Sequence, residues 1–261
     1  MSVKVMDIIG KLESLAPEAL AEDWDNVGLQ VGSIHNKVSK ILLALDATTE
    51  TIDEAISIGA HMIITHHPMI FTPLKQVTQD KVLGNNIYKL IQNNISLYVM
   101  HTNLDTAFGG TNDVLGDIIG LYNVQGLSPD DGGMGIGRIG NVKTTTVTEL
   151  TQRLKEGLDI SHARIVGNLQ QRVNKVAICT GSGMSYLKHA IGKADVFITG
   201  DVKFHEAQEA WENHIGVIDV GHYGSENIVM PKIKEYMEEF MLANNLEIIV
   251  SQINGDPFSI I

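Results

Sequence analysis

The feature that most limits how this chain folds is an alternation of short apolar runs with amphipathic segments, which occurs twice. The first set of apolar runs lies at 40–46, 61–67 and 95–101, with helix-like segments at 48–59 and 80–94 between them. The second set lies at 175–183, 194–201 and 215–222, separated by helix-like segments near 184–192 and at 202–214. This β-α-β-α-β order is typical of parallel sheets with right-handed crossovers. The sequence therefore predicts an α/β protein of two βαβαβ-type halves, which form two α/β domains.

The remaining segments complete this plan. Residues 4–15 have the apolar spacing of a helix, about 225–244 reads as one long helix, and 246–253 reads as a last strand. We expect a first domain of residues 1–125 plus 222–261 and a second of residues 126–221. Residues 135–140, Gly-Ile-Gly-Arg-Ile-Gly, have the letters of a dinucleotide-binding loop, but the next helix begins only near Thr146, where Thr146 and Glu149 have capping-box spacing. A glycine-rich loop that enters a strand is the better interpretation.

Composition limits the possible partners and compartments. The net charge of −12 and the pI of about 5.2 argue against broad binding to nucleic acid, which needs a basic surface. The apolar runs are far shorter than the roughly 20 residues that cross a bilayer. The first residues form no hydrophobic signal region, and the single cysteine, Cys179, reads as a core thiol, so we expect a cytoplasmic protein.

Polar side chains follow the predicted strands where ligands of open parallel sheets bind, outside the carboxyl ends. In the first half, Asp46 ends the first strand, His66 and His67 end the second, and His101 ends the third. Neighbouring side chains on a strand diverge, but a turn before Pro68 can bring both imidazoles toward one site, where they suit two nearby ions better than one. A solvated histidine pair in a loop is the alternative.

Three further residues complete a possible ligand set. Asp105 follows the third strand and its two oxygens suit a bridge between two metals, although an N-cap or Asx-turn is the alternative. His222 and Glu226 are four residues apart and share a face if a helix begins near His222; otherwise Glu226 is a favourable charge in a first helical turn. Three histidines and two carboxylates suffice for two divalent ions such as Zn, Mn or Fe.

Other polar residues have two interpretations each. His101 lines the site and moves protons, or it simply ends its strand. Asp46 accepts a hydrogen bond from a ligand histidine, or it caps the next helix. Asp201 and His205, four apart, form a pair beside the ligands or the substrate, or they are a helix-start carboxylate and a surface histidine. Asn26 lies with Trp24 and Asp25 in a loop that covers the site, or that anchors a buried tryptophan.

The whole set of blocks resembles the Nif-three-like family, also called GTP cyclohydrolase 1 type 2-like. The matching blocks span nearly the whole chain: EDWDNVGLQVG, LALDAT, ITHHP, HTNLD, GIGRIG, FITGDVKFHEA and GHYGSE. The resemblance implies a two-domain α/β fold with a dinuclear metal site near the domain interface, with ligands at His66, His67, Asp105, His222 and Glu226. It also implies a toroidal homohexamer, a trimer of dimers. With only about 50 residues between its halves, the chain looks like the short form that lacks an inserted middle domain.

Two classes of function follow from these features. By resemblance, the chain is a metal-dependent hydrolase that opens the imidazole ring of GTP at C8 and releases formate, with a related metal-dependent nucleotide phosphohydrolase as the alternative enzyme. Bound metal would supply hydroxide near neutral pH. The other class is a metal-binding regulatory scaffold without catalysis, whose site would be closed rather than open to water.

Overall fold

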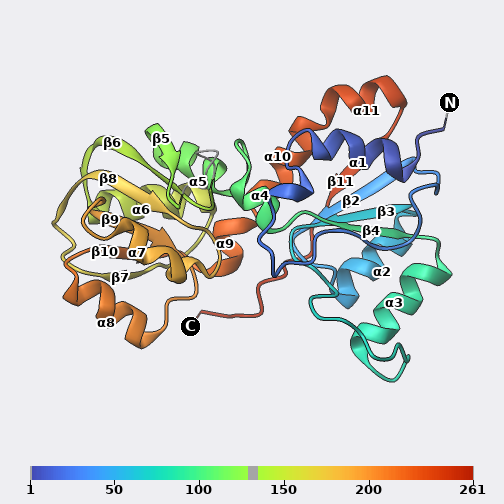
Figure 1. Ribbon diagram of the computed structural model, residues 1–261, viewed down its shortest axis with the longest axis horizontal. Helices are drawn as coiled ribbons and strands as arrows, with labels where there is room; N and C mark the ends of the chain where they lie inside the picture. The colour runs from blue at the N-terminus through green and yellow to red at the C-terminus, as the bar shows by residue number, and fades with distance from the viewer. Residues whose placement is uncertain (1, 129–134, 261) are drawn as a thin grey trace. The chain divides into compact units, whose positions relative to one another are not determined.

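The computed structural model describes residues 2–128 and 135–260. The chain divides into two compact units, one made of Met1–Leu104 with Met230–Ile261 and the other of Asp105–Val229. Each unit contains one mixed β-sheet with helices packed on it, which confirms the predicted α/β class (Figure 1). None of the described helices has both the length and the apolar character needed to cross a membrane.

The sheet of the first unit has the order β1-β4-β3-β2-β11. Its strands are β1 (Gly28–Val31), β2 (Lys40–Ala44), β3 (Met62–Thr65), β4 (Ser96–Val99) and β11 (Glu247–Val250). The neighbouring strands β4, β3, β2 and β11 are parallel to one another. Strand β1 pairs antiparallel with β4 at the edge of the sheet. Strands β3 and β4 are buried along their whole length, as expected for parallel strands covered on both faces.

Helices cover both faces of this sheet. Helices α2 (Thr49–Ser57) and α3 (Val82–Gln92) pack on one face, and α1 (Val5–Glu13), α10 (Val229–Tyr236) and α11 (Glu238–Asn244) lie toward the other (Figure 1). A short 3₁₀ turn, η1 (Glu18–Leu20), follows α1. Thr48 caps α2 by accepting the amide hydrogen of Thr51, which explains why the helix begins directly after the Asp46 loop.

The sheet of the second unit has the order β5-β6-β8-β9-β10-β7. Its strands are β5 (Tyr122–Gly126), β6 (Arg138–Thr146), β7 (Arg164–Val166), β8 (Arg172–Ile178), β9 (Val196–Thr199) and β10 (Gly216–Asp219). Strands β8, β9 and β10 are parallel, as the βαβαβ pattern predicts, whereas β5, β6 and β7 add antiparallel pairs at both sides.

Alternate residues of the central strands serve two different cores. Val176 and Ile178 pack with the helices α5 (Thr111–Ile119) and α6 (Val147–Leu158), and Ala177 and Cys179 pack on the opposite side with α7 (Leu187–Ala190) and α8 (Phe204–Glu212). The period of two along β8 therefore places helices on both faces. The short elements α4 (Thr102–Thr106), η2 (Gly183–Tyr186) and α9 (His222–Glu226) lie at strand ends. Thr146 and Glu149 form the expected capping box at the start of α6.

Two expected boundaries differ from those observed. The first domain was expected to extend to residue 125, but β5 pairs with β6, so residues 105–126 lie in the second unit. The chain returns to the first unit at Met230 rather than at His222. The single long helix expected at 225–244 is wrong, because the segment forms three helices, α9, α10 and α11. Pro231 lies in the first turn of α10, where its missing amide hydrogen is tolerated, so a new helix begins there.

Candidate metal centre

Three imidazole rings lie together in the first unit. His66 and His67 follow β3, and His101 follows β4, which is the neighbouring parallel strand. The ring centroids are 5.1 Å apart for His66 and His67, 5.2 Å for His66 and His101, and 5.6 Å for His67 and His101. One ring nitrogen of each lies within 4.8 Å of those of the other two, which is close enough for a shared metal. We call His66, His67 and His101 the imidazole group.

Each ring of the imidazole group is oriented by an oxygen acceptor. The Nδ1 atom donates to the Met100 carbonyl oxygen in His66 (2.8 Å), to Asp46 Oδ1 in His67 (2.8 Å) and to Asp25 Oδ1 in His101 (2.9 Å). Carbonyl and carboxylate oxygens only accept, so the hydrogen is on Nδ1, and in the neutral form of each ring the lone pair is on Nε2. This is the arrangement by which outer partners fix the tautomer of metal-binding histidines.

The turn after β3 explains how two adjacent histidines come together. The Thr65 hydroxyl donates to the His67 carbonyl oxygen at 2.9 Å, and the His67 amide donates to the Leu45 carbonyl oxygen at 3.0 Å. These bonds end the regular strand at Thr65 and tie the turn to the end of β2. His66 is fully buried, while the His67 side chain keeps 21% of its surface exposed.

Asp25 lies beside the imidazole group and is held by three hydrogen bonds. Its side chain is fully buried and accepts hydrogen bonds from His101, from the Thr102 amide at 3.0 Å and from the Thr102 hydroxyl. Burial alone would raise the pKa of Asp25, but the bonds from His101 and Thr102 outweigh it and lower the pKa to about 2. The carboxylate is therefore ionised at neutral pH and favours a hydrogen on Nδ1 of His101.

In the second unit, a histidine and a glutamate lie on one short helix. Helix α9 begins at His222 and ends at Glu226, so the two side chains share a face, with Nε2 of His222 2.9 Å from Oε2 of Glu226. Glu226 is buried at 3% exposure. A buried carboxylate beside an imidazole nitrogen is a mixed donor pair of the kind that Zn, Mn and Fe accept. Gly181 makes this possible, because a Cβ there would lie 2.0 Å from Glu226 Oε1.

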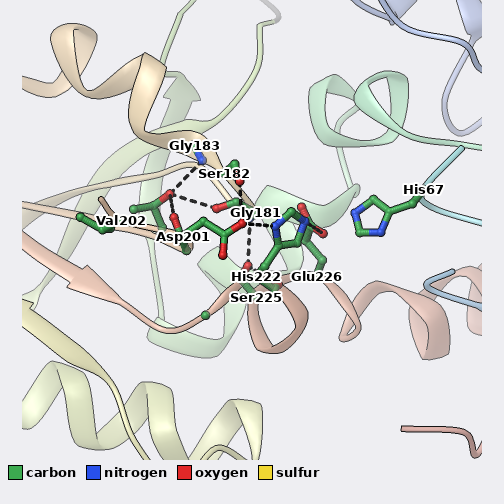
Figure 2. Close-up of polar contacts among 12 residues, drawn as sticks. His67, Gly181, Ser182, Gly183, Asp201, Val202, His222, Ser225 and Glu226 are labelled. Carbon is green, nitrogen blue, oxygen red and sulfur yellow. Dashed lines mark hydrogen bonds and ion pairs between the residues drawn. The ribbon is translucent and has the colours of Figure 1, made fainter. Parts of the chain in front are cut away.

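A polar network binds the Nδ1 side of His222, opposite the Nε2 atom that faces Glu226. Figure 2 shows Asp201, which accepts from His222 Nδ1 at 2.7 Å and from the Ser182 hydroxyl at 2.7 Å. Burial raises the pKa of Asp201, but the hydrogen bonds from His222 and Ser182 are stronger and lower it overall. Asp201 has φ of +54°, a left-handed conformation that is uncommon for residues other than glycine, although aspartate adopts it more readily than most. Asp201 therefore orients His222 as Asp46 orients His67.

The other residues that the sequence singled out have varied positions. Asp105 is buried in α4 and its carbonyl oxygen accepts from the Asn112 amide group, while its role as a bridging ligand stays a prediction. The Asn26 amide group donates to the Ile70 carbonyl oxygen. His205 is exposed on α8 and its Nδ1 contacts Gln208 Oε1 at 3.0 Å, so the structure pairs it with Gln208 rather than with Asp201.

Sequence reasoning passed over two residues that organise the candidate ligands. Asp25 was considered only as part of a covering loop, although it holds His101, and its position between Trp24 and Asn26 in a turn-rich stretch was the one available signal. Ser182 was seen only as part of a strand-end glycine stretch, although its hydroxyl holds Asp201. Both act through contacts between segments far apart in sequence, which spacing does not reveal.

Comparison with known proteins agrees with the family resemblance seen in the sequence. The sequence profile of the Duf34/NIF3 (NGG1p interacting factor 3) family matches residues 3–257. The chain belongs to the Duf34/NIF3 family. A Clostridium perfringens family member named GTP cyclohydrolase 1 type 2 homolog is 41% identical over 264 residues, which cover 99% of this chain and all of that protein. The present family member therefore corresponds to the short form without an inserted middle domain, as the sequence predicted.

Solved structures of similar proteins show the same fold. A Staphylococcus aureus hypothetical protein superimposes with a TM-score of 0.93 at 31% identity and covers all of both chains. A Bacillus cereus protein related to NIF3 also gives a TM-score of 0.93, at 28% identity, and covers 100% of this chain and 99% of that one. The two-unit α/β fold of this chain is therefore the fold of its family.

Proposed function

We propose that the chain is a metal-dependent hydrolase that opens the imidazole ring of GTP. The observation that carries this proposal is the imidazole group, in which three rings present nitrogen atoms within 4.8 Å and each Nδ1 has an oxygen acceptor. The name of the Clostridium perfringens relative supports GTP as the substrate class. The residues suit a bound transition metal, because imidazole is a good ligand for Zn and Fe and oriented imidazoles bind better.

The proposal assigns different roles to the three rings. His66 and His67 hold metal, and His101 moves a proton at Nε2, because Asp25 keeps the hydrogen of His101 on Nδ1. When bound, the metal lowers the pKa of a coordinated water and so supplies hydroxide near neutral pH. Water addition at C8 opens the ring of GTP, and C8 leaves as formate after a second hydrolysis.

The ligand role of Asp105, His222 and Glu226 belongs to the same proposal, with two divalent ions per chain. It is supported by the 2.9 Å approach of His222 Nε2 to Glu226 Oε2 and by the hold of Asp201 on His222. The identity of the ions, Zn, Mn or Fe, is open to the same metal analysis. The homohexamer is likewise a proposal, and light scattering combined with size-exclusion chromatography measures it directly.

Metal analysis together with a formate assay tests the function. Wild-type protein should bind about two ions per chain and release formate from GTP, and His67→Ala should lose metal and activity together. His101→Ala should keep its metal and lose formate release, since a proton carrier is not needed for binding. His205→Ala is the matched control, because that exposed histidine pairs with Gln208, and it should match wild type.

Three results would change the proposal. Equal metal in wild type and His67→Ala would refute the site. Loss of metal in His101→Ala would make His101 a ligand and remove its proton role. Metal binding without formate or phosphate release from GTP would favour the regulatory scaffold.

A further inference from the structure

Two exposed aromatic rings lie beside the imidazole group. Trp24 and Phe71 keep 56% and 51% of their surface exposed, although large aromatic side chains are usually well buried. Their ring centroids are 6.0 Å apart, and the Trp24 indole lies 6.1 Å from the His101 imidazole. Both rings belong to the first unit and come from loops after η1 and after β3.

The two loops that carry these rings are fastened to each other. The Gln30 side chain donates from Nε2 to the Ile70 carbonyl oxygen at 3.0 Å, and its Oε1 accepts from the Ile70 amide at 2.8 Å. Asn26 donates to the same carbonyl oxygen. Asp25, next to Trp24, is bound to His101. The residues next to both rings are therefore fixed by hydrogen bonds, and Trp24 is tied to the imidazole group by its neighbour.

Neither Phe71 nor His101 stacks parallel to the Trp24 indole. Phe71 is inclined to Trp24 by 57° and His101 by 78°, so both meet it as tilted or edge contacts rather than stacked ones. An exposed indole is a good surface on which a flat aromatic heterocycle such as a nucleobase can stack. Because hydrogen bonds already hold the residues next to the two rings, a ligand that stacks there loses little free energy in ordering these loops.

We propose that Trp24, supported by Phe71, is a stacking platform for the purine base of the substrate. This inference rests on the proposed function and names the part of the substrate that each region recognises. The platform binds the heterocycle, whose reacting ring is then close to His101. The continuity from Phe71 through Trp24 to His101 favours a small planar ligand over a distant partner.

Fluorescence offers a direct test because the chain has only two tryptophans, Trp24 and Trp211. In the metal-loaded Trp211→Phe variant, all tryptophan emission comes from Trp24. Guanosine and GTP should both quench this emission, and inorganic triphosphate should not. The matched control is Trp24→Phe, in which the exposed Trp211 of α8 is the reporter and guanosine should leave the emission unchanged.

Affinity measurements on the same variants give the magnitude. Trp24→Ala should weaken guanosine binding about 5- to 150-fold, which is the range for loss of one base–aromatic stack. Trp24→Phe should weaken it less, because a smaller ring still stacks. Trp24 is exposed, so these variants should retain the wild-type circular dichroism spectrum.

The outcomes separate this inference from the proposed function. If Trp24→Ala binds guanosine and releases formate from GTP as wild type does, the platform is refuted and the hydrolase stands. If guanosine quenches Trp24 but wild type releases no formate, the platform stands and the hydrolase falls. If guanosine leaves the Trp24 emission unchanged but dilution of the protein changes it, the ring lies in a contact between copies of the chain, and the platform is refuted.

Discussion

Arg138 is fully enclosed in the second unit, and its replacement should be one of the most damaging single changes there. Its side chain is 1% exposed and donates to both carboxylate oxygens of Asp113, at 2.7 and 2.9 Å. It also donates to four carbonyl oxygens at 2.7–3.0 Å, those of Thr106, Ala107, Gly135 and Gly137. The Thr106 carbonyl is the last of α4, the helix that contains Asp105, and the Ala107 carbonyl follows it directly. Arg138 therefore links the start of β6 to the end of α4.

The expected magnitude follows from what Arg138→Met leaves behind. Removing one member of a buried ion pair costs about 3–5 kcal/mol, because the remaining charge has lost its partner. Four carbonyl oxygens lose their donor as well, at up to roughly 1 kcal/mol each where water does not replace it. Asp113 keeps 19% exposure and a bond from the Gly109 amide, so water relieves part of the loss. We expect the free energy of unfolding to fall by about 3–4 kcal/mol.

Urea unfolding followed by circular dichroism measures this loss. A Trp24→Phe background makes Trp211 the only tryptophan, and its emission assigns the transition to the second unit. The control is Arg172→Met, an exposed arginine on β8, which should change stability by less than about 0.5 kcal/mol. The double variant Arg138→Met with Asp113→Asn should lose less than the sum of the single losses. If Arg138→Met were within 1 kcal/mol of Arg172→Met, about the error of such comparisons, the ion-pair argument would be refuted.

Three further predictions concern separate parts of the chain. Asp46→Ala should weaken metal binding about 10- to 100-fold in a chelator competition, because His67 loses its acceptor, whereas Asp53→Ala on the exposed face of α2 should have no effect. Thr146→Ala should lower the unfolding free energy by about 1 kcal/mol through loss of the α6 cap, and Thr146→Ser should restore it. Burial, followed by the negative charges of Glu13 and Glu18, raises the pKa of Tyr98 in the folded chain. Above pH of about 10 the tyrosine ionises only in the unfolded chain. The stability that Tyr98 contributes is therefore present below pH of about 10 and is lost above it. Tyr98→Phe should flatten that alkaline fall in urea titrations, and the exposed Tyr122→Phe should not.

The sequence was sufficient to predict the fold class and the edge of each sheet where the candidate ligands lie. Four-residue buried strands such as β3 and β9 appear as short apolar runs, and the polar residue that ends each run marks the carboxyl end. The antiparallel strands β5 and β7 were less visible because their residues are mostly exposed or half-buried, so no apolar run marks them. The long helix predicted from 225 to 244 was wrong because apolar spacing continues through the breaks at residues 227–228 and at Met237.

The Gly-Ile-Gly-Arg-Ile-Gly stretch matches a dinucleotide-binding motif in sequence but has a different structural role. Its glycines serve close packing: a Cβ at Gly137, where φ is +75°, would lie 2.6 Å from the Ile178 carbonyl oxygen. A Cβ at Gly140 would lie 2.8 Å from the Tyr122 carbonyl oxygen. The strand β6 begins at Arg138, which confirms a loop that enters a strand and not a dinucleotide-binding turn. Arg138 was missed because its partners Thr106, Ala107 and Asp113 are 25–32 residues away in sequence.

The order of the strands explains how the two adjacent histidines are oriented by different neighbours. Strand β3 lies between β4 and β2, and each of its two histidines is held from a different side. His66 is bound to the Met100 carbonyl oxygen after β4, and His67 is bound to Asp46 after β2. One anchor is a backbone atom, which no substitution removes, and the other is a side chain. Loss of Asp46 should therefore loosen His67 alone and leave His66 in place. If the proposed metal site is right, replacement of Asp46 should change its metal affinity through His67 and leave the position of His66 unchanged.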